Sequence, residues 1–289
     1  MLGAFSLSEY RNFSECTLQF SPNINVFLGD NGQGKSNLLE ALSLATQGES
    51  FRSFENKYLI KNNELKANIN IEKKQNNLDF KLQTSLEGNL RSHFVNGKKT
   101  NSTFLKKKFL NILFSPDSLE IIKSSSEKRR RLIDDLIVSI NPNNSKLLSE
   151  FQKCLKTRNR VLKDYTKQKQ SRIRTIDILE AINPSFLDFS GQITIQRKIA
   201  IKNILRDFNV AMQYISNQTD LHISIDYQVS GKNIMNLEDS TIYSQMKNRV
   251  SELREMELAS GVSLVGPHRH DIRFLFNNHD SRFFCSQGQ

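Results

Sequence analysis

Apolar and polar residues alternate with two different periods along this chain, and the change of period separates strands from helices. Positions 67–72 and 78–86 alternate one by one, which is typical of half-exposed antiparallel strands, and Asn96-Gly97 is a hairpin signal. Positions 4–7 and 17–20 have the composition of two shorter strands. The N-terminal part of the chain therefore predicts an antiparallel sheet.

From about residue 117 the strand alternation stops, and charged residues at helical spacing take over. Asn183-Pro184 is a helix-start signal, and Ser260-Gly261 is a helix-stop signal. The pattern predicts helices over 126–138, from about 144, over 184–216 and over 239–259, with a strand over 221–229.

A glycine-rich turn lies between two apolar runs near the N-terminus. Residues 24–28 predict a strand, and 37–44 predict a buried helix that Gly48 ends. The turn between them matches G-x-x-x-x-G-K-[ST], with the residues Gly29, Asp30, Asn31, Gly32, Gln33, Gly34, Lys35 and Ser36.

Backbone N–H groups of such a loop hold phosphate oxygens, and the dipole of the following helix favours negative charge there. In this motif Lys35 reaches the β and γ phosphates and Ser36 is the Mg²⁺ ligand. We therefore expect ATP and Mg as cofactors, and the alternative is a glycine-rich turn that happens to precede a helix.

The charge balance points to polyanionic partners. The 289 residues hold 41 Lys+Arg against 30 Asp+Glu, a net charge of +11. Between residues 153 and 174 there are nine basic residues and one acid. One stripe of the predicted helix carries the DNA-binding candidates Lys153, Lys156, Arg160, Lys163 and Lys167. A solvated basic face without such a partner is the alternative.

Three cysteines, Cys16, Cys154 and Cys285, are widely spaced and odd in number, which favours neither a disulfide framework nor a zinc site. The N-terminus lacks the charge and apolar pattern of a signal peptide, and no run approaches the ~18 apolar residues of a membrane span. We expect a cytoplasmic protein with no membrane partner.

Several further motifs join the phosphate loop in an order that resembles the RecF family, bacterial DNA replication and repair proteins with an ABC/SMC-like ATPase head. The resemblance spans nearly the whole chain. The motifs are Tyr10-Arg-Asn-Phe13, the loop 29–36, Ser50-Phe-Arg-Ser53, Phe114-Ser-Pro-Asp-Ser-Leu119, residues 127–134, Lys156-Thr-Arg-Asn159, Gly266-Pro-His-Arg269 and Ser286-Gln-Gly-Gln289.

The resemblance implies an α/β fold, a P-loop ABC-type ATPase head with a mixed sheet, an antiparallel subsheet and an inserted helical lobe. We expect ATPase lobe I with the P-loop and the antiparallel subdomain over 1–116. A mainly helical, basic lobe II is expected over 117–260, and residues 261–289 are expected to return to the ATPase core and end at the signature motif.

The resemblance also assigns residues. Ser286, Gln287, Gly288 and Gln289 look like the family's ABC signature motif, which grips the γ-phosphate held by a second subunit and so implies an ATP-dependent homodimer. Arg11 and Asn12 would lie near the nucleotide, and the alternative is a turn-capping Asn beside a surface Arg. Asp117 is a possible Q-loop counterpart.

One expected part is missing from the sequence. ABC ATPases need a Walker B strand, an apolar run that ends in Asp followed by an acid, to hold Mg²⁺ and orient water. Ile133-Asp134-Asp135 follows a helical pattern, and Ile223-Ser-Ile-Asp226 alternates. In the family this strand lies beyond the signature motif, so we expect a fragment that lacks the C-terminal strands of the core and binds nucleotide without hydrolysing it.

By resemblance, the intact protein is an ATP-binding, DNA-binding protein of recombinational repair that also serves DNA replication and SOS induction. Head dimerisation would clamp single-stranded or gapped DNA, hydrolysis would release it, and recombination mediator proteins would be partners. The alternatives are a P-loop small-molecule kinase and a non-hydrolysing DNA-binding fragment.

Overall fold

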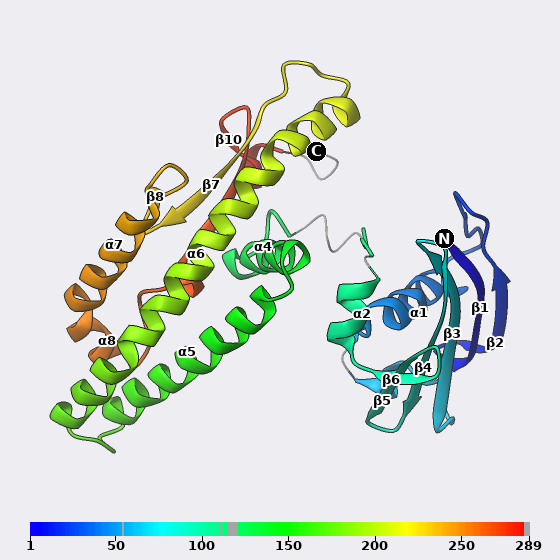
Figure 1. Ribbon diagram of the computed structural model, residues 1–289, viewed down its shortest axis with the longest axis horizontal. Helices are drawn as coiled ribbons and strands as arrows, with labels where there is room; N and C mark the ends of the chain where they lie inside the picture. Colours follow the sequence, from blue (N-terminus) through cyan, green and yellow to red (C-terminus); the bar gives the residue numbers. More distant parts are fainter. Residues whose placement is uncertain (54, 110, 115–120, 286–289) are drawn as a thin grey trace. The chain divides into compact units, whose positions relative to one another are not determined.

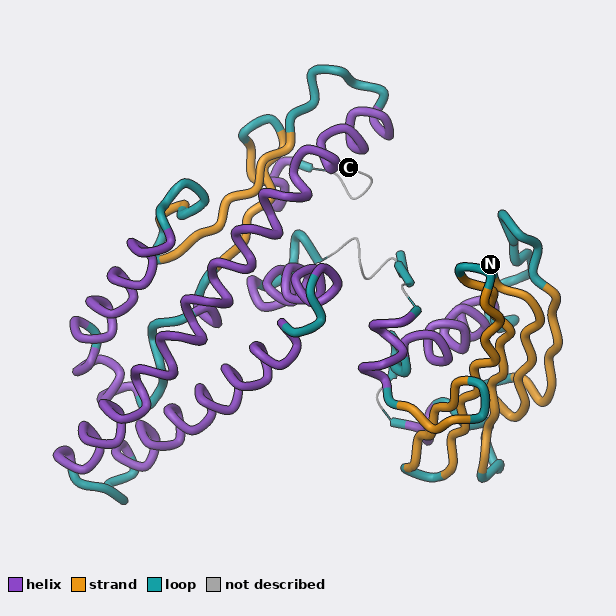
Figure 2. The backbone as a smooth tube through the Cα atoms, viewed as in Figure 1, coloured by secondary structure: helices purple, strands orange, loops and turns teal. Residues whose placement is uncertain are grey.

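The chain forms two compact units, Met1–Leu113 and Phe114–Gln289, which we call the N-terminal and C-terminal units. The computed structural model describes residues 1–53, 55–109, 111–114 and 121–285. Strands dominate the N-terminal unit and helices the C-terminal one (Figures 1 and 2).

The N-terminal unit is built on one antiparallel sheet with the strand order β2-β1-β3-β4-β5-β6. Helices α1 and α2 pack against each other, and α1 also contacts β3 and β4. The elements are β1 (Leu2–Tyr10), β2 (Phe13–Gln19), α1 (Lys35–Gln47), β3 (Lys66–Gln75), β4 (Leu78–Glu87), β5 (Leu90–Val95), β6 (Lys98–Thr100) and α2 (Ser102–Lys108). A short 3₁₀ turn covers Asn56–Tyr58.

The alternation in β3 and β4 places Ile69, Ile71 and Leu82 on the face that α1 covers, where they join one core with Leu38 and Leu44 of that helix. Gly48 ends α1 in the left-handed region, with φ +76, and donates its N–H to the Leu44 carbonyl. The expected strands near 4–7, 17–20, 67–72 and 78–86 and the expected helix near 37–44 are thus confirmed. The hairpin at Asn96-Gly97, where both φ angles are positive, is confirmed as well.

The prediction of a strand at residues 24–28 is wrong. The segment has no regular structure, and Ile24, Val26 and Leu28 are 81%, 71% and 88% exposed. A strand needs a hydrogen-bonded neighbour, and none of the described strands pairs with this segment. Only Phe27 reaches the core, where its ring lies edge-on to Phe20.

The C-terminal unit packs helices against a second antiparallel sheet, with the strand order β10-β9-β7-β8. The core between α6 and this sheet includes Ile201, Ile225, Ile272 and Met246. The elements are α4 (Ser126–Ile140), α5 (Asn144–Thr166), α6 (Arg172–Ser216), β7 (Ile223–Val229), β8 (Lys232–Asn233), α7 (Asp239–Glu252), α8 (Arg254–Ser260), β9 (Asp271–Phe276), β10 (His279–Asp280) and α9 (Ser281–Phe284). A 3₁₀ turn covers Pro267–Arg269.

Helix α6 does not begin at Pro184, as the sequence predicted, but at Arg172, and it continues through the proline. Proline removes one N–H donor from the helix ladder and clashes with the preceding turn. Packing on both sides offsets that cost here, because Leu179 and Phe186 are buried on either side of Pro184. The antiparallel neighbour α5 runs along the same stretch of α6 (Figure 1).

The prediction of a single helix over 239–259 is also wrong. It is divided into α7 and α8 at Leu253, whose N–H caps α7 by donating to the Arg249 carbonyl. Gly261 ends α8 with φ +71, as the Ser260-Gly261 signal predicted.

Residues 271–276 form β9, which pairs with β7 inside the C-terminal unit. The expected boundaries of the three segments, including a return of 261–289 to an ATPase core, stay predictions. All strand pairings among the described residues are antiparallel, so the parallel pairs of a mixed core sheet are not among them.

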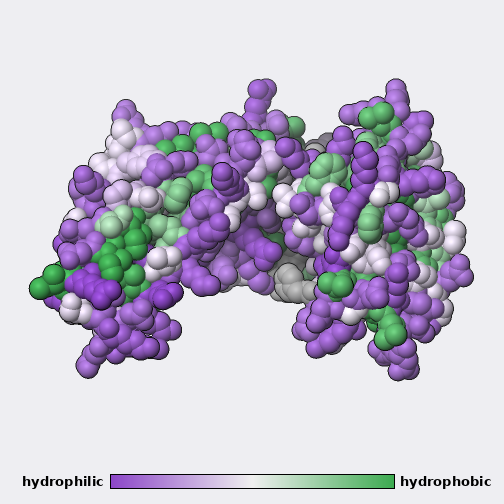
Figure 3. All heavy atoms as spheres, turned by 60° about the horizontal axis from the view of Figure 1, so that its bottom comes forward, coloured by the Kyte–Doolittle hydropathy of each residue, from purple (hydrophilic) through white to green (hydrophobic). Residues whose placement is uncertain are grey.

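Hydrophilic side chains cover most of the face drawn in Figure 3, and apolar side chains form small groups between them. Within the described ranges, no helix combines the length and the apolar character needed to cross a membrane.

Candidate functional site

The phosphate loop leads directly into α1. Gly29, Gly32 and Gly34 have φ angles of +149, +83 and +101, a region that side chains with a Cβ rarely adopt. Gly34 is the N-cap of α1, and its carbonyl accepts hydrogen bonds from the N–H groups of Asn37 and Leu38. The first turn of a helix leaves its N–H groups without intrahelical partners, so they are available to an anion.

The Lys35 ammonium lies inside this loop. Its Nζ donates to the Gly29 carbonyl at 2.6 Å and to the Asp30 carbonyl at 2.7 Å. The lysine that the motif assigns to phosphate binding is therefore held over the loop rather than extended into solvent. Ser36, the expected Mg²⁺ ligand, is exposed in the first turn of α1.

Asn12, in the turn between β1 and β2, contacts the phosphate loop directly. Its Nδ2 donates to the Gln33 carbonyl at 3.3 Å, and its Oδ1 accepts from Asn37 Nδ2 at 2.8 Å. A Cβ added to Gly34 would lie 2.6 Å from Phe13 Cζ and 2.8 Å from the Asn12 amide. This turn therefore packs so closely on the loop that only glycine fits at position 34.

Arg11 is not a free surface arginine. It occupies the left-handed region with φ +53, and its guanidinium binds both carboxylate oxygens of Glu40 at 2.8 and 2.9 Å. This hydrogen-bonded pair raises the pKa of Arg11. Contact of Arg11 or Asn12 with a nucleotide stays a prediction.

The sequence interpretation gave no site role to two polar residues beside the loop, although Arg52 lies in one of its motifs. Glu40 is completely buried, and the Arg52 guanidinium donates to Asn37 Oδ1 at 2.8 Å. A signal for Glu40 was present, because an acid within the apolar run 38–44 lies where the helical period places buried positions. No local pattern marks Arg52 as a neighbour of Asn37, since the chain between them turns back on itself.

Two groups of expected site residues lie outside the described residues. They are the possible Q-loop counterpart Asp117 and the signature motif Ser286, Gln287, Gly288 and Gln289. Their roles stay predictions.

Two acidic segments of the C-terminal unit were considered for the Walker B role, and neither is an apolar strand that ends in an unpaired Asp. Asp134 lies in helix α4 and accepts both Arg197 Nε and Nη2, at 2.7 and 2.9 Å. Asp226 lies in β7 and accepts from Asn233 and Gln228. Both carboxylates are engaged in contacts within the C-terminal unit, Asp134 with an arginine 63 positions away and Asp226 with two nearby side-chain amides.

The five DNA-binding candidates are all exposed. Lys153, Lys156, Arg160 and Lys163 lie on α5, and Lys167 is its C-cap. They line one groove of about 840 Å³ together with Gly261 and Val262. Two of them have acidic neighbours on the same helix, Lys153 with Glu150 at 2.8 Å and Arg160 with Asp164 at 3.9 Å. The groove therefore gathers five cations, although DNA contact by them stays a prediction.

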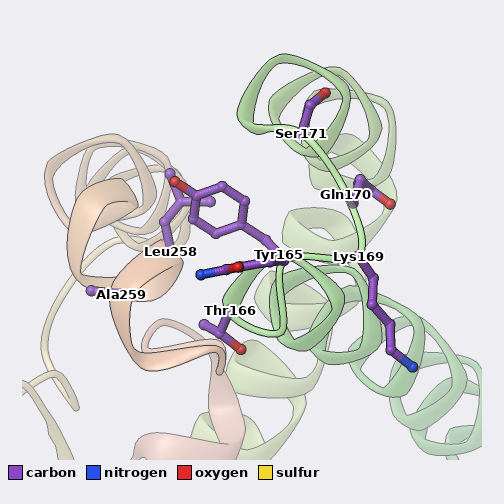
Figure 4. A pocket seen from close by; sticks show the side chains of 8 residues that line it. Tyr165, Thr166, Lys169, Gln170, Ser171, Leu258 and Ala259 are labelled. Atoms are coloured by element: carbon purple, nitrogen blue, oxygen red, sulfur yellow. The ribbon is translucent and has the colours of Figure 1, made fainter.

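A second, more open depression of about 570 Å³ lies where α5 turns into α6 (Figure 4). Tyr165 lies beside Leu258 of α8, and Lys169 is among the residues that line the pocket (Figure 4). This arrangement leaves the α5–α6 turn polar and basic, next to the groove.

The Gly266-Pro-His-Arg segment is held by buried polar contacts. The Arg197 guanidinium donates to the Pro267 carbonyl at 2.9 Å, and His268 Nε2 lies 3.1 Å from the Ser263 carbonyl. Burial lowers the pKa of His268 to about 4 and that of His270 well below its ordinary value, so both imidazoles are neutral at pH 7. These contacts position the segment and assign no metal to it.

The residues of the N-terminal unit fit a magnesium–nucleotide complex. Gly29 and Gly32 have open space where a Cβ would stand, so the loop backbone is free to approach a phosphate chain. Lys35 supplies the positive charge and Ser36 a hydroxyl at the helix start. Such a complex would supply the γ-phosphoryl group and its charge, which this loop is built to neutralise.

Comparison with known proteins agrees with this geometry. A family model described as "AAA domain" matches residues 5–257. The structure of the recombination mediator protein RecF with ATP in the RecFOR pathway aligns with a TM-score of 0.86 at 29% identity, covering 100% of this chain and 76% of that one. The fold and the phosphate loop together define an ATPase head of the P-loop class, which confirms the α/β fold class expected from the sequence.

The relatives define the family more narrowly. The chain is 31% identical to the DNA replication and repair protein RecF of Thermoanaerobacter sp. (strain X514), covering 98% of this chain and 76% of that protein. It is 32% identical to RecF of Staphylococcus carnosus (strain TM300), covering 100% and 77%. The chain belongs to the RecF family.

Proposed function

We propose that this chain is an ATP-binding, DNA-binding protein of DNA replication and recombinational repair. The observation that carries the proposal is the braced phosphate loop at 29–36, in a chain whose whole fold aligns with ATP-bound RecF at a TM-score of 0.86. A loop whose backbone is already in place loses little conformational entropy when phosphate binds.

The second part of the proposal is that the basic face of α5 contacts the DNA backbone. The five exposed cations line one groove, and phosphate neutralisation requires density of positive charge rather than a base-reading motif. Single-stranded or gapped DNA would be held through backbone and shape.

The third part concerns assembly. ATP held by Lys35 and Ser36 of one copy would be gripped by Ser286 and Gly288 of a second, so that the active unit is an ATP-dependent homodimer that clamps DNA. In a chain that carries the Walker B acids, hydrolysis would open the clamp. Action in the cytoplasm, in the SOS response and with recombination mediator proteins belongs to the same proposal.

The nucleotide part is tested with Lys35→Ala. Binding of a fluorescent ATP analogue in the presence of Mg²⁺, followed by anisotropy, should be lost, because the lysine that neutralises the β and γ phosphates is gone. The matched control is Lys107→Ala, which removes an equally charged, exposed residue from α2 of the same unit. Equal affinity of Lys35→Ala and the native chain would refute the site.

The DNA part is tested by the salt dependence of binding to a single-stranded oligonucleotide. Neutralising three phosphate-contacting lysines should lessen the slope of log K against log[salt] by about 2, at ~0.7 for each contact. A near-zero slope for the native chain would favour a small-molecule kinase instead. The test variant carries Lys156→Gln, Lys163→Gln and Lys167→Gln, and the control carries Lys66→Gln, Lys98→Gln and Lys107→Gln.

A further inference from the structure

Glu40 is an acid in the apolar core of the N-terminal unit. It lies in α1, one turn beyond Lys35 and Ser36, and none of its surface is exposed. Its helical neighbours Ala41 and Leu44 are also fully buried. Taking a carboxylate out of water is costly unless it is paired and hydrogen-bonded, so its surroundings must compensate the charge.

The carboxylate joins two separate turns of the chain to α1. Arg11, from the turn between β1 and β2, binds both oxygens at 2.8 and 2.9 Å in a bidentate pair. The Ser50 hydroxyl donates at 2.5 Å to Oε1, the oxygen that also accepts from Arg11 Nη2. The same hydroxyl accepts the N–H groups of Arg52 and Ser53 at 3.0 and 2.9 Å, and so fixes the turn at 50–53.

Each of the two turns that Glu40 holds also touches the phosphate loop. Asn12, next to Arg11, contacts the Gln33 carbonyl and Asn37, as described above. From the second turn, Arg52 donates to Asn37 Oδ1. Asn37 immediately follows Ser36, so both turns meet at the start of α1.

We propose that Glu40 is a positioning residue for nucleotide binding. It touches no nucleotide, but by holding Arg11 and Ser50 at once it keeps both turns against the phosphate loop. The loop is then already in its binding arrangement before phosphate arrives. This inference rests on the proposed nucleotide site.

The decisive variant is Glu40→Gln, with Glu49→Gln as its control. Glutamine keeps the volume but has one acceptor oxygen, so it cannot serve Arg11 twice and Ser50 as well. If only about a tenth of the molecules then hold both turns in place, affinity for the fluorescent ATP analogue falls about tenfold. Glu49 lies just beyond α1 and pairs with Lys106 at 2.6 Å on the exposed surface, so its loss should leave affinity unchanged.

Ser50→Ala separates positioning from folding, because it leaves the Arg11–Glu40 pair intact. It should weaken nucleotide binding several-fold, while the urea midpoint falls by less than in Glu40→Gln. The double variant of Glu40→Gln and Ser50→Ala should bind the nucleotide no more weakly than Glu40→Gln alone. The turn at 50–53, which Ser50→Ala releases, is already released by Glu40→Gln.

The outcomes are distinguishable. If Lys35→Ala binds nucleotide like the native chain, the proposed site itself fails. If Lys35→Ala abolishes binding but Glu40→Gln and Ser50→Ala bind normally, only the positioning role is overturned. If Glu40→Gln does not fold, Ser50→Ala decides alone, and native affinity in that variant refutes the proposal.

Discussion

The buried pair between Arg158 of α5 and Glu257 of α8 should be the most sensitive ionic contact of the C-terminal unit. Arg158 Nη2 and Glu257 Oε2 are 2.6 Å apart, and the two side chains are 1% and 2% exposed. The guanidinium also donates to Ser263 Oγ at 2.7 Å and lies 4.9 Å from the centroid of the Phe186 ring. The other Glu257 oxygen accepts the Leu264 N–H at 2.7 Å.

Glu257→Gln tests this contact without a change of volume. Both Glu257 oxygens face donors, and glutamine offers only one oxygen, so its amide N–H₂ must face either the guanidinium or the Leu264 N–H. The variant leaves the Arg158 charge buried without its counterion, for which we expect a loss of about 3–5 kcal/mol in the free energy of unfolding.

The assay is urea unfolding followed by far-UV circular dichroism, because helices α4 to α8 all lie in the C-terminal unit and the chain has no tryptophan. The control is Glu255→Gln, two residues away. Glu255 also lies 2.6 Å from its partner, Arg172, but those side chains are 64% and 53% exposed, so solvent screens the pair and the midpoint should barely move.

Equal midpoints for the Glu257 and Glu255 variants would refute the reasoning, since the two pairs share their distance and differ in burial. A second check replaces both buried partners with apolar residues, Arg158→Met with Glu257→Leu. The double variant should be more stable than Glu257→Gln, because it leaves no buried charge unpaired. A double variant as unstable as the single one would show that the loss came from packing.

Three further predictions concern packing and pH. Gly34→Ala should greatly weaken binding of the fluorescent ATP analogue, since its Cβ would lie 2.6 Å from Phe13 Cζ; native affinity would contradict this. Gly191→Ala should lower the free energy of unfolding by about 1–3 kcal/mol, because its Cβ would lie 2.2 Å from Tyr243 Cε1; an unchanged urea midpoint would be inconsistent with that contact. Burial lowers the pKa of His93 from 6.5 to about 4, so between these pH values the unfolded chain binds a proton that the folded chain does not, and stability falls as pH falls. His93→Asn should lessen that decline in the urea midpoint, and identical pH profiles would exclude the effect.

Local patterns in the sequence predicted much of the fold. The alternation at 67–72 and 78–86 became β3 and β4, and Gly48 and Gly261 end helices as predicted. These features depend on neighbouring residues alone, through side-chain period and backbone conformation. The phosphate loop was predictable for the same reason, since its glycines and Lys35 lie within eight consecutive residues.

Where the sequence interpretation was wrong, contacts between distant residues outweighed local preference. Pro184 is a helix-start signal, yet α6 passes through it because Leu179 and Phe186 are buried on either side. The apolar run 24–28 has the composition of a strand, but no described strand pairs with it. A strand forms only where a neighbouring strand accepts and donates its backbone hydrogen bonds.

The sequence by itself therefore determined the phosphate loop and the basic stripe of α5, because both depend on the identity and spacing of nearby residues. It also determined the family, because the motifs follow the family's order. Only the tertiary structure decided which polar groups brace that loop. Glu40 meets Arg11 and Ser50, and Arg158 meets Glu257, across 29, 10 and 99 positions of chain. A buried charge is costly unless it is paired and hydrogen-bonded, so each of these buried carboxylates requires its partners. Those partners come from distant positions of the chain, which only the fold brings together.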